Sequence, residues 1–582
     1  MNLVPTLGQL ENAQLVRQMI GDDAAYIFKH ALTQETAYNS LLQKQRREIH
    51  RQVAETYEKF YADHLDDYAA MLARHYDQVG DDAKTITYLT RAGDVAARVN
   101  ANVEAIAHYT RALEIGKRAG AHPQDLQLKL GRLYELNDQH DRALALYAEM
   151  ETHARECGDR ALELAALMAR ATIYSIPSKQ SNRALAQTLC DQALELARAI
   201  GDQPAEAKIL WNLLLLNTRL RTNYRHAIGY GEQGLAIARK LNLREQTAYL
   251  LNDLSLPCAY AGDPERGEAL NLQARQMWRE MKILPMVADN LSYAAMIYIA
   301  LARYDDAIAV AEEAHAISVS IGNVWGQAFS TSWIGEAYRA TGHITQAIAA
   351  MEEAIRTAVS GFQPPLAFTR ADLGALYGDL GLIAHGIELA ELAYAVGRDQ
   401  ADVMKIWTAA QLGHLYLRDA RVARAATYVA EASENITPTD HESLFGAANI
   451  LTLVELRLAQ NDYARAVQAC DQFIEYKHTH RLRQDLPNAL YFKALALQKM
   501  GDANQARMLL NEARIEAEST NARWIWWRIL AALAEMENNR ARARELRTNA
   551  RAIITFIADH TPDNLRASFL NTPEVRAVME AQ

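Results

Sequence analysis

Apolar and polar positions along most of the chain follow the spacing of amphipathic helices that pair into hairpins. In each pair an apolar helix ends in small residues and often an aromatic, a short turn follows, and the next helix has a small residue one turn in. Clear examples span 334–355, 373–394 and 412–432. Apolar residues at i, i+3 and i+4 give each helix one apolar face. The pattern predicts an all-α chain of consecutive helical hairpins.

The small residue of the second helix recurs with a period of about 40 residues, which marks an internal repeat. A small residue there lets the second helix approach the first, while leucines and aromatics fill the space between neighbouring hairpins. No single hairpin can bury its apolar face, so each depends on the next and the chain is expected to form a solenoid. The small residues are Ala143, Ala184, Ala227, Gly267, Ala307, Ala347, Gly386, Ala425, Ala466 and Ala506.

These hairpins resemble the tetratricopeptide family over roughly residues 65–560. The first helices carry L-G-x-x-Y, several turns carry a glycine, and the small residue follows five positions later. The period of about 40 exceeds the 34 residues of that family. The resemblance implies about a dozen hairpins in a right-handed superhelical solenoid. The matching residues are Leu130, Gly131, Tyr134, Leu373, Gly374, Tyr377, Leu412, Gly413, Tyr416, Gly342, Gly381 and Gly501.

Residues 26–54 do not follow the repeat; their pattern predicts a short strand, a turn and a basic amphipathic helix. This stretch resembles the end of the winged-helix domain in bacterial signal-transduction ATPases. These are multidomain proteins associated with class III adenylate and guanylate cyclases and with maltose-regulator-type activators. The resemblance implies a sensor arm, made separately or cut from a longer chain. The matching residues are Phe28, His30, Leu32, Ala37, Tyr38, Leu41, Leu42, Arg46, His50 and Ala54.

Three regions are therefore predicted. Residues 1–62 form a partial winged-helix-like segment that caps the array, 63–560 form the solenoid, and 561–582 form a C-terminal helical cap. In the cap, Thr561 and Thr572 are each followed by a proline and then an acidic residue, a pattern typical of helix starts. The pattern predicts two short helices.

The composition and motifs of the sequence argue against several classes of function. The net charge of −10 argues against a nucleic-acid surface, because phosphate neutralisation needs clustered Lys and Arg. The sequence contains no phosphate-binding G-x-x-x-x-G-K-[ST] and no metal or nucleophile signature, so we expect a non-enzymatic protein without a cofactor or metal. Four scattered cysteines and the lack of a long apolar stretch favour a cytoplasmic location and no membrane contact. We expect the tryptophans of 523–530 to pack in the core rather than to form a binding site.

In the tetratricopeptide family the first helices line the concave face. We number the positions of each first helix so that Gly335 is position 8 of its own helix. Position 5 of the successive first helices is then occupied by Asn212, Asn252, Ser292 and Ser332. An asparagine there often holds a peptide backbone or terminal carboxylate in the family, so the resemblance implies that role for the two asparagines, and the serines depart from it. The neighbouring groove positions supply Arg219, Tyr249, Asp289, Phe329, Glu336, Arg339, Phe368, Trp407 and His414.

Amide and hydroxyl groups with aromatic anchors suit an extended peptide or a polar small ligand. We therefore expect a scaffold or regulatory sensor arm of a bacterial signalling system that binds a protein segment in the groove, with an ATPase or cyclase module docking at the N-terminal segment. One alternative is a small-molecule inducer sensor of a transcription-regulator ATPase, with a deep pocket near Trp407 and Phe368. Another is the C-terminal fragment of a cyclase–ATPase protein.

Overall fold

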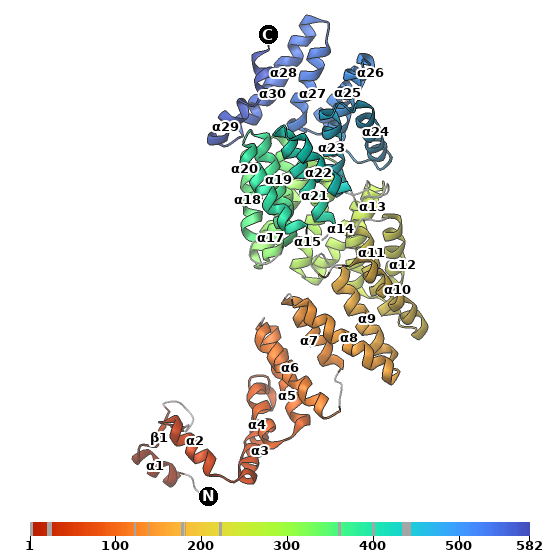
Figure 1. Ribbon diagram of the computed structural model, residues 1–582. Helices are drawn as coiled ribbons and strands as arrows, with labels where there is room; N and C mark the ends of the chain where they lie inside the picture. Colours follow the sequence, from red (N-terminus) through yellow and green to blue (C-terminus); the bar gives the residue numbers. More distant parts are fainter. Residues whose placement is uncertain are drawn as a thin grey trace. The chain divides into compact units, whose positions relative to one another are not determined.

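The computed structural model is built from consecutive helical hairpins, as the sequence predicts (Figure 1). It describes residues 4–19, 26–99, 101–120, 124–137, 139–175, 180, 182–219, 224–358, 363–398, 402–433 and 444–581. The chain divides into two compact units, Met1–Ala166 and Leu167–Gln582. This division lies inside the repeat array, in helix α9 (Arg160–Ser175). The boundaries predicted at residues 62 and 560 separate different kinds of segment and stay predictions.

Near its start, after helix α1 (Val4–Asn12), the first unit has a two-stranded antiparallel hairpin in which Val16 of β1 (Val16–Gln18) pairs with Phe28 of β2 (Tyr26–Phe28). The strand and the basic helix expected after residue 26 are present, but a further helix (Ala31–Ser40) lies between them where only a turn was expected. The winged-helix relationship stays a prediction. A core of leucines, alanines and tyrosines, among them Leu72 and Tyr109, holds the later helices together. The helical elements of the unit are α1 (Val4–Asn12), α2 (Ala31–Ser40), α3 (Gln43–Phe60), η1 (Ala62–His64), α4 (Ala69–Val79), α5 (Asp82–Arg98), α6 (Asn102–Arg118), α7 (Gln124–Leu136) and α8 (His140–Cys157).

The second unit continues the array through α10 (Arg183–Ile200). The first helices of its hairpins are α11 (Gln203–Arg219), α13 (Arg244–Tyr260), α15 (Leu284–Ala300), α17 (Val324–Thr341), α19 (Gln363–Asp379), α21 (Asp402–Arg418), α23 (Leu444–Ala459), α25 (Leu486–Lys499) and α27 (Arg523–Met536). The second helices are α12 (Tyr224–Lys240), α14 (Pro264–Met281), α16 (Tyr304–Ser320), α18 (Ile344–Ala358), α20 (Ile383–Gly397), α22 (Val422–Ser433), α24 (Tyr463–Thr479), α26 (Ala503–Ser519) and α28 (Arg540–Asp559).

The predicted small residues occupy the contact between paired helices. All of those predicted in the hairpins from α11 to α26 are buried. The closest approach is at Gly386, where an added Cβ would lie 2.4 Å from the backbone oxygen of Gly374 on the facing helix. One assignment was wrong: Ala184 is exposed, and Ala186 is the buried small residue of α10. The polar stretch 175–182 adds residues before α10, so the small residue of this helix comes later in the sequence than the repeat spacing predicts.

Hairpins far apart in sequence also touch within the second unit. The backbone amides of Arg483 and Gln484 both donate to the carbonyl oxygen of Ala300, at 3.0 and 3.1 Å. Thr345 Oγ1 donates to the carbonyl of His560, 215 residues later, at 2.8 Å. Helix α17 likewise packs against α27. The solenoid of this unit therefore coils far enough for later turns to rest on earlier ones; we call these the inter-turn contacts.

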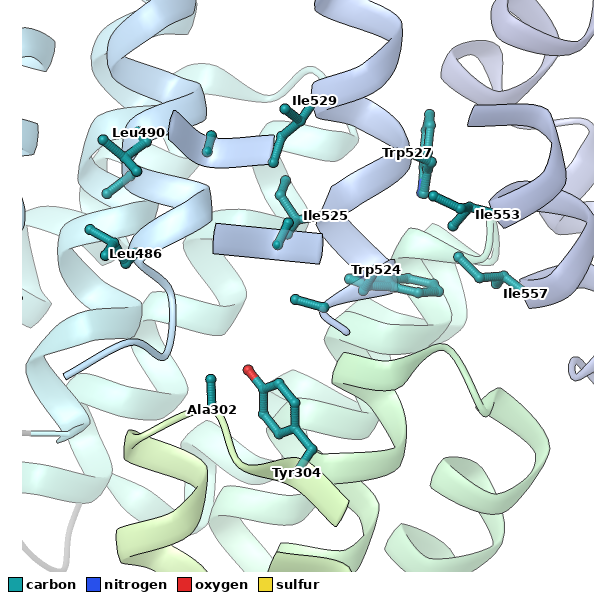
Figure 2. Packing of buried hydrophobic residues seen from close by; sticks show 14 of the residues in the cluster. Ala302, Tyr304, Leu486, Leu490, Trp524, Ile525, Trp527, Ile529, Ile553 and Ile557 are labelled. Carbon is teal, nitrogen blue, oxygen red and sulfur yellow. The ribbon is translucent and has the colours of Figure 1, made fainter. Parts of the chain in front are cut away.

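The C-terminal end closes the array. Helices α29 (Asp563–Leu570) and α30 (Pro573–Glu580) confirm the two short helices expected there. The tryptophans of α27 pack as predicted: Trp524 and Trp527 are buried and lie beside Ile557 and Ile553 of α28 (Figure 2). Among the described helices, none combines the length and apolarity that a bilayer crossing needs.

Candidate functional site

The four residues predicted at position 5 lie on successive first helices, α11 to α17, and each already makes contacts inside the protein. Asn212 is buried, and its amide lies 3.4 Å from Thr172 Oγ1. Ser292 donates to the carbonyl of Ala288 at 3.1 Å. Ser332 Oγ lies 2.7 Å from Thr369 Oγ1 on the next first helix. Asn212 and Ser332 therefore link neighbouring first helices, whereas Ser292 bonds within its own helix α15.

Asn252 belongs to a buried amide network between α13, α14 and α15. Its side-chain oxygen accepts from Asn290 Nδ2 at 2.7 Å, and Asn290 Oδ1 accepts from Arg275 Nε at 2.9 Å. Arg275 also donates to Asn271 Oδ1 at 2.7 Å, and burial lowers the pKa of its guanidinium. Because Asn252 has no exposed surface, a peptide would reach its amide only by displacing this network. The backbone-clamp role of the two asparagines stays a prediction.

The predicted aromatic residues near this network pack in edge-to-face and stacked groups. The half-buried ring of Tyr249 lies 4.8 Å from that of Trp278. The half-buried ring of Phe329 stacks on Trp325 at 4.7 Å. Pairs of this kind add about 0.5–1.5 kcal/mol beyond their buried area. These rings therefore strengthen the wall of first helices.

Two further predicted residues complete this part of the chain. Asp289 Oδ2 lies 3.5 Å from Asn252 Nδ2, so it contacts the amide network from α15. Arg219 is the last residue of α11, and its side chain lies outside the described residues.

The remaining predicted residues converge on a set of charged side chains spread over α17, α19, α21 and α23. We call this set the inner charge cluster. Consecutive first helices pack side by side here, as α19 does against α21, which brings the same face of each helix together. The cluster consists of Glu336, Arg339, Asp372, Asp379, His414, Arg418 and Glu455.

Glu336 and Arg339 form one end of the cluster. The guanidinium of Arg339 donates Nε and one terminal nitrogen to the two oxygens of Glu336, at 2.9 and 2.8 Å. A bidentate pair of this kind has a fixed orientation. The Arg339 side chain nevertheless keeps 30% of its surface accessible, so the pair has a face open to a ligand.

Asp372 lies at the centre of the cluster. Trp407 Nε1 donates to its carboxylate at 2.8 Å, and Gln411 Nε2 donates to the same oxygen at 2.9 Å. Burial and the nearby charge of Glu336 raise the pKa of Asp372 to about 7, against the opposing effect of Arg339. Its charge is therefore sensitive to anything that binds beside it near neutral pH. The ring of Phe368 meets Trp407 edge-on at 6.0 Å.

His414 forms the other end and bridges three helices. Its Nδ1 lies 2.7 Å from Glu455 on α23, and its Nε2 lies 3.2 Å from Asp379 on α19. Burial alone lowers the pKa of His414, but the two carboxylates outweigh it and raise the pKa to about 10. Both ring nitrogens therefore donate at neutral pH, and His414 carries a positive charge. Arg418 Nε adds a second cation 3.5 Å from Asp379.

Sequence reasoning found part of this cluster and missed the rest. It named Glu336, Arg339 and His414, which the fold brings together with Trp407 and Phe368. It missed four acids and bases on the same helix faces, although a seven-residue spacing gave a signal that could have found the two on α19. The missed residues are Asp372, Asp379, Arg418 and Glu455.

The cluster is suited to holding charged groups in fixed positions. Cations and anions alternate across it on rigid helices, so both signs of charge are presented to a ligand. Within the described part of the chain, no group of three or more His, Cys, Asp or Glu side chains has the arrangement to hold a metal ion.

Several solved structures align with the chain at low sequence identity. No family model and no curated protein matches it. The Cut9–Hcn1 hetero-tetramer of the APC/C aligns at 13% identity and a TM-score of 0.45, over 95% of this chain and 99% of that one. A signal transduction ATPase with numerous domains and a tetratricopeptide repeat sensor, from Pyrococcus horikoshii, aligns at 16% and 0.43, over 74% and 61%. The Rap conjugation gene regulator of plasmid pLS20, in complex with the Phr* peptide, aligns at 16% and 0.39, over 49% and 76%. Likenesses this distant carry no information on ligand or activity.

Proposed function

We propose that the chain is a non-enzymatic binding scaffold that holds a partner-protein segment against the inner charge cluster. The observation that supports this most is the run of partly exposed charges across four consecutive first helices. Arg339, which pairs with Glu336 on its own helix, keeps 30% of its side-chain surface accessible. His414 and Glu455, which pair across helices, keep 17% and 24%. Removing charges from water is costly, so a network kept half open is better suited to recognition than to stability alone.

The chemistry of the cluster indicates the kind of segment. Cations and anions are nearly balanced, so a segment with both signs of charge fits better than a strongly acidic or basic one. Phe368 and Trp407 add an apolar edge beside the charges. Aromatic and arginine side chains are the residues that most often dominate binding energy in protein interfaces.

A peptide-library screen with fluorescence polarisation tests the proposal. A peptide that binds the wild-type chain is measured again with Trp407→Ala and with Arg339→Ala, and each variant is expected to bind at least about tenfold more weakly, a loss of about 1.4 kcal/mol or more. Arg356→Ala is the matched control, because this arginine lies on the second helix α18 with 68% of its side chain exposed. Binding that survives both cluster substitutions would show that the segment docks elsewhere.

A small-molecule sensor is the second candidate. The observation that favours it is the inter-turn contacts, which bring Asp485 close enough to Arg339 to shift the pKa of its guanidinium. A charge cluster approached by a later turn of the same unit favours a compact ligand over a long one. Thermal-shift screening of peptides and metabolites in parallel separates the two candidates, since only one class should raise the melting temperature.

The signalling role is a further part of the proposal. It rests on the N-terminal resemblance and on exposed apolar side chains at that end: Leu32 and Leu42 are 77% and 71% exposed. Such side chains suit docking of another protein module, as expected for an ATPase or cyclase partner. Leu32→Ser with Leu42→Ser should abolish co-purification with that partner and leave peptide binding at the inner charge cluster unchanged.

A further inference from the structure

A second set of polar side chains lies at the inter-turn contacts, and one of them, Asp485, lies close enough to Arg339 of the inner charge cluster to affect the pKa of its guanidinium. The set lies where the end of α13 and the turn after α15 meet the loop between α24 and α25. Tyr476 Oη donates to the carbonyl of Tyr260 at 3.3 Å, and the loop amides of Arg483 and Gln484 donate to Ala300. We call the set formed by Tyr260, Lys477, Gln484 and Asp485 the inter-turn site.

Lys477 is the most unusual member. Only 4% of its surface is exposed. In the described part of the chain its ammonium forms no hydrogen bond or ion pair, and its nearest recorded neighbour is the ring of Phe473, with Nζ 5.0 Å from the centroid. Burial lowers the pKa of Lys477 to about 8, with Asp485 opposing. A buried lysine is normally paired, so this ammonium has spare bonding capacity.

Two further atoms of the site lack hydrogen-bond partners. Tyr260 is 2% exposed, and its hydroxyl has no partner. The side-chain oxygen of Gln484, which is also buried, has none either. Buried polar atoms are satisfied in the great majority of protein structures, so these two unmet atoms and the unpaired ammonium of Lys477, on segments that the inter-turn contacts bring together, indicate a ligand position.

Asp485 supplies a negative charge to the same place. Its backbone lies in the left-handed region with φ of 61°, and its side chain does not cap α25. Burial raises the pKa of its carboxyl group, while its charge raises the pKa values of Lys477 and Tyr260. Another charge at the inter-turn contacts, that of Arg481, is by contrast paired with Glu265 at 2.7 Å.

The four groups are complementary to one small molecule with both charges. The ammonium of Lys477 and the hydroxyl of Tyr260 are donors for an anionic group. The carboxylate of Asp485 and the oxygen of Gln484 are acceptors for a cationic one. We propose that the inter-turn site binds a small zwitterion of the amino-acid class, its carboxylate on Lys477 and Tyr260 and its ammonium on Asp485 and Gln484. A ligand bound there would join an earlier turn of the solenoid to a later one.

Isothermal titration of the full chain with the standard L-amino acids tests this site. At least one should bind with one-to-one stoichiometry. Its N-acetyl and carboxamide analogues, which each lose one charge, should bind at least about tenfold more weakly. Lys477→Met should abolish binding without lowering the melting temperature, because it removes an unpaired buried cation and keeps the apolar stem. Lys499→Met, at an exposed lysine of α25, is the control and should bind like the wild type.

Tyr260→Phe provides a second variant that removes only the unpartnered hydroxyl. It should fold like the wild type and weaken binding about fivefold. The proposal is wrong if no amino acid binds the wild type, or if Lys477→Met and Tyr260→Phe bind as tightly as it does. Trp407→Ala should leave amino-acid binding unchanged, and Lys477→Met should leave peptide binding unchanged, so this site and the proposed scaffold function can fail separately.

Discussion

Substitution of Gly386 by alanine tests whether the close approach of paired helices requires the small residues of the repeat. An added Cβ at Gly386 would lie 2.4 Å from the carbonyl oxygen of Gly374 and 3.0 Å from the backbone nitrogen of Gly378. Both atoms belong to the backbone of α19, which cannot rotate away as a side chain can. Ordinary contact begins near 3.4 Å, so α19 and α20 would have to separate by about 1 Å.

The expected magnitude follows from two opposing effects. Overpacking against a rigid neighbour costs about 1–3 kcal/mol, and a gap of this size forfeits part of the dispersion energy between the helices. Alanine recovers up to about 1 kcal/mol of helix propensity over glycine. We therefore expect Gly386→Ala to destabilise the α19–α20 hairpin by about 1–2 kcal/mol. Gly229→Ala in α12, where the added Cβ meets nothing within 4 Å, should instead stabilise by up to about 1 kcal/mol.

Urea unfolding followed by circular dichroism measures the overall effect, and hydrogen exchange by mass spectrometry locates it. Repeat arrays open locally, so exchange should accelerate in peptides from α19 and α20 in Gly386→Ala and slow in α12 in Gly229→Ala. A Gly386→Ala protein as stable as the wild type, with unchanged exchange at α19, would refute the packing argument.

Three further predictions concern the ionisation of His414, the reactivity of the cysteines and the ionisation of Glu58. Because the folded pKa of His414 is raised from 6.5 to about 10, its ion pairs stabilise fully below pH 6.5 and lose their effect as the pH rises through 10; His414→Gln should flatten the fall in melting temperature over that range. In native protein Cys157 alone should react quickly with a thiol reagent, since the other three cysteines are buried, and denaturant should release all four. Glu58 accepts hydrogen bonds from Tyr88 and Lys84 at 2.6 and 2.9 Å, which outweigh burial and lower its pKa. Its contribution is present above pH 4.5 and lost as the pH falls through the lower folded value, so Glu58→Gln should cost about 2 kcal/mol in urea unfolding at pH 7 and progressively less in acid.

The predicted groove residues show that the sequence predicts the helix on which a residue lies but not the burial or charge of its side chain. Helical periodicity placed Asn252 on a first helix and Trp407 on another, because both positions follow from local spacing. Burial of Asn252 depends on Asn290 and Arg275, which come from the next helices, so no local pattern reports it. The charge of His414 depends in the same way on acids 35 and 41 residues away.

The sequence by itself determined the hairpins, their period and the small residues that let paired helices approach. These features rest on contacts within one hairpin or between neighbours, and such contacts are encoded in short-range patterns of side-chain size and polarity. Only the tertiary structure decided which turns of the second unit meet and which polar groups they enclose. The contact between Arg481 and Glu265 spans 216 residues. Its position depends on small rotations added over several hairpins, so the local pattern around Lys477 does not show that this residue is buried where its turn meets an earlier one.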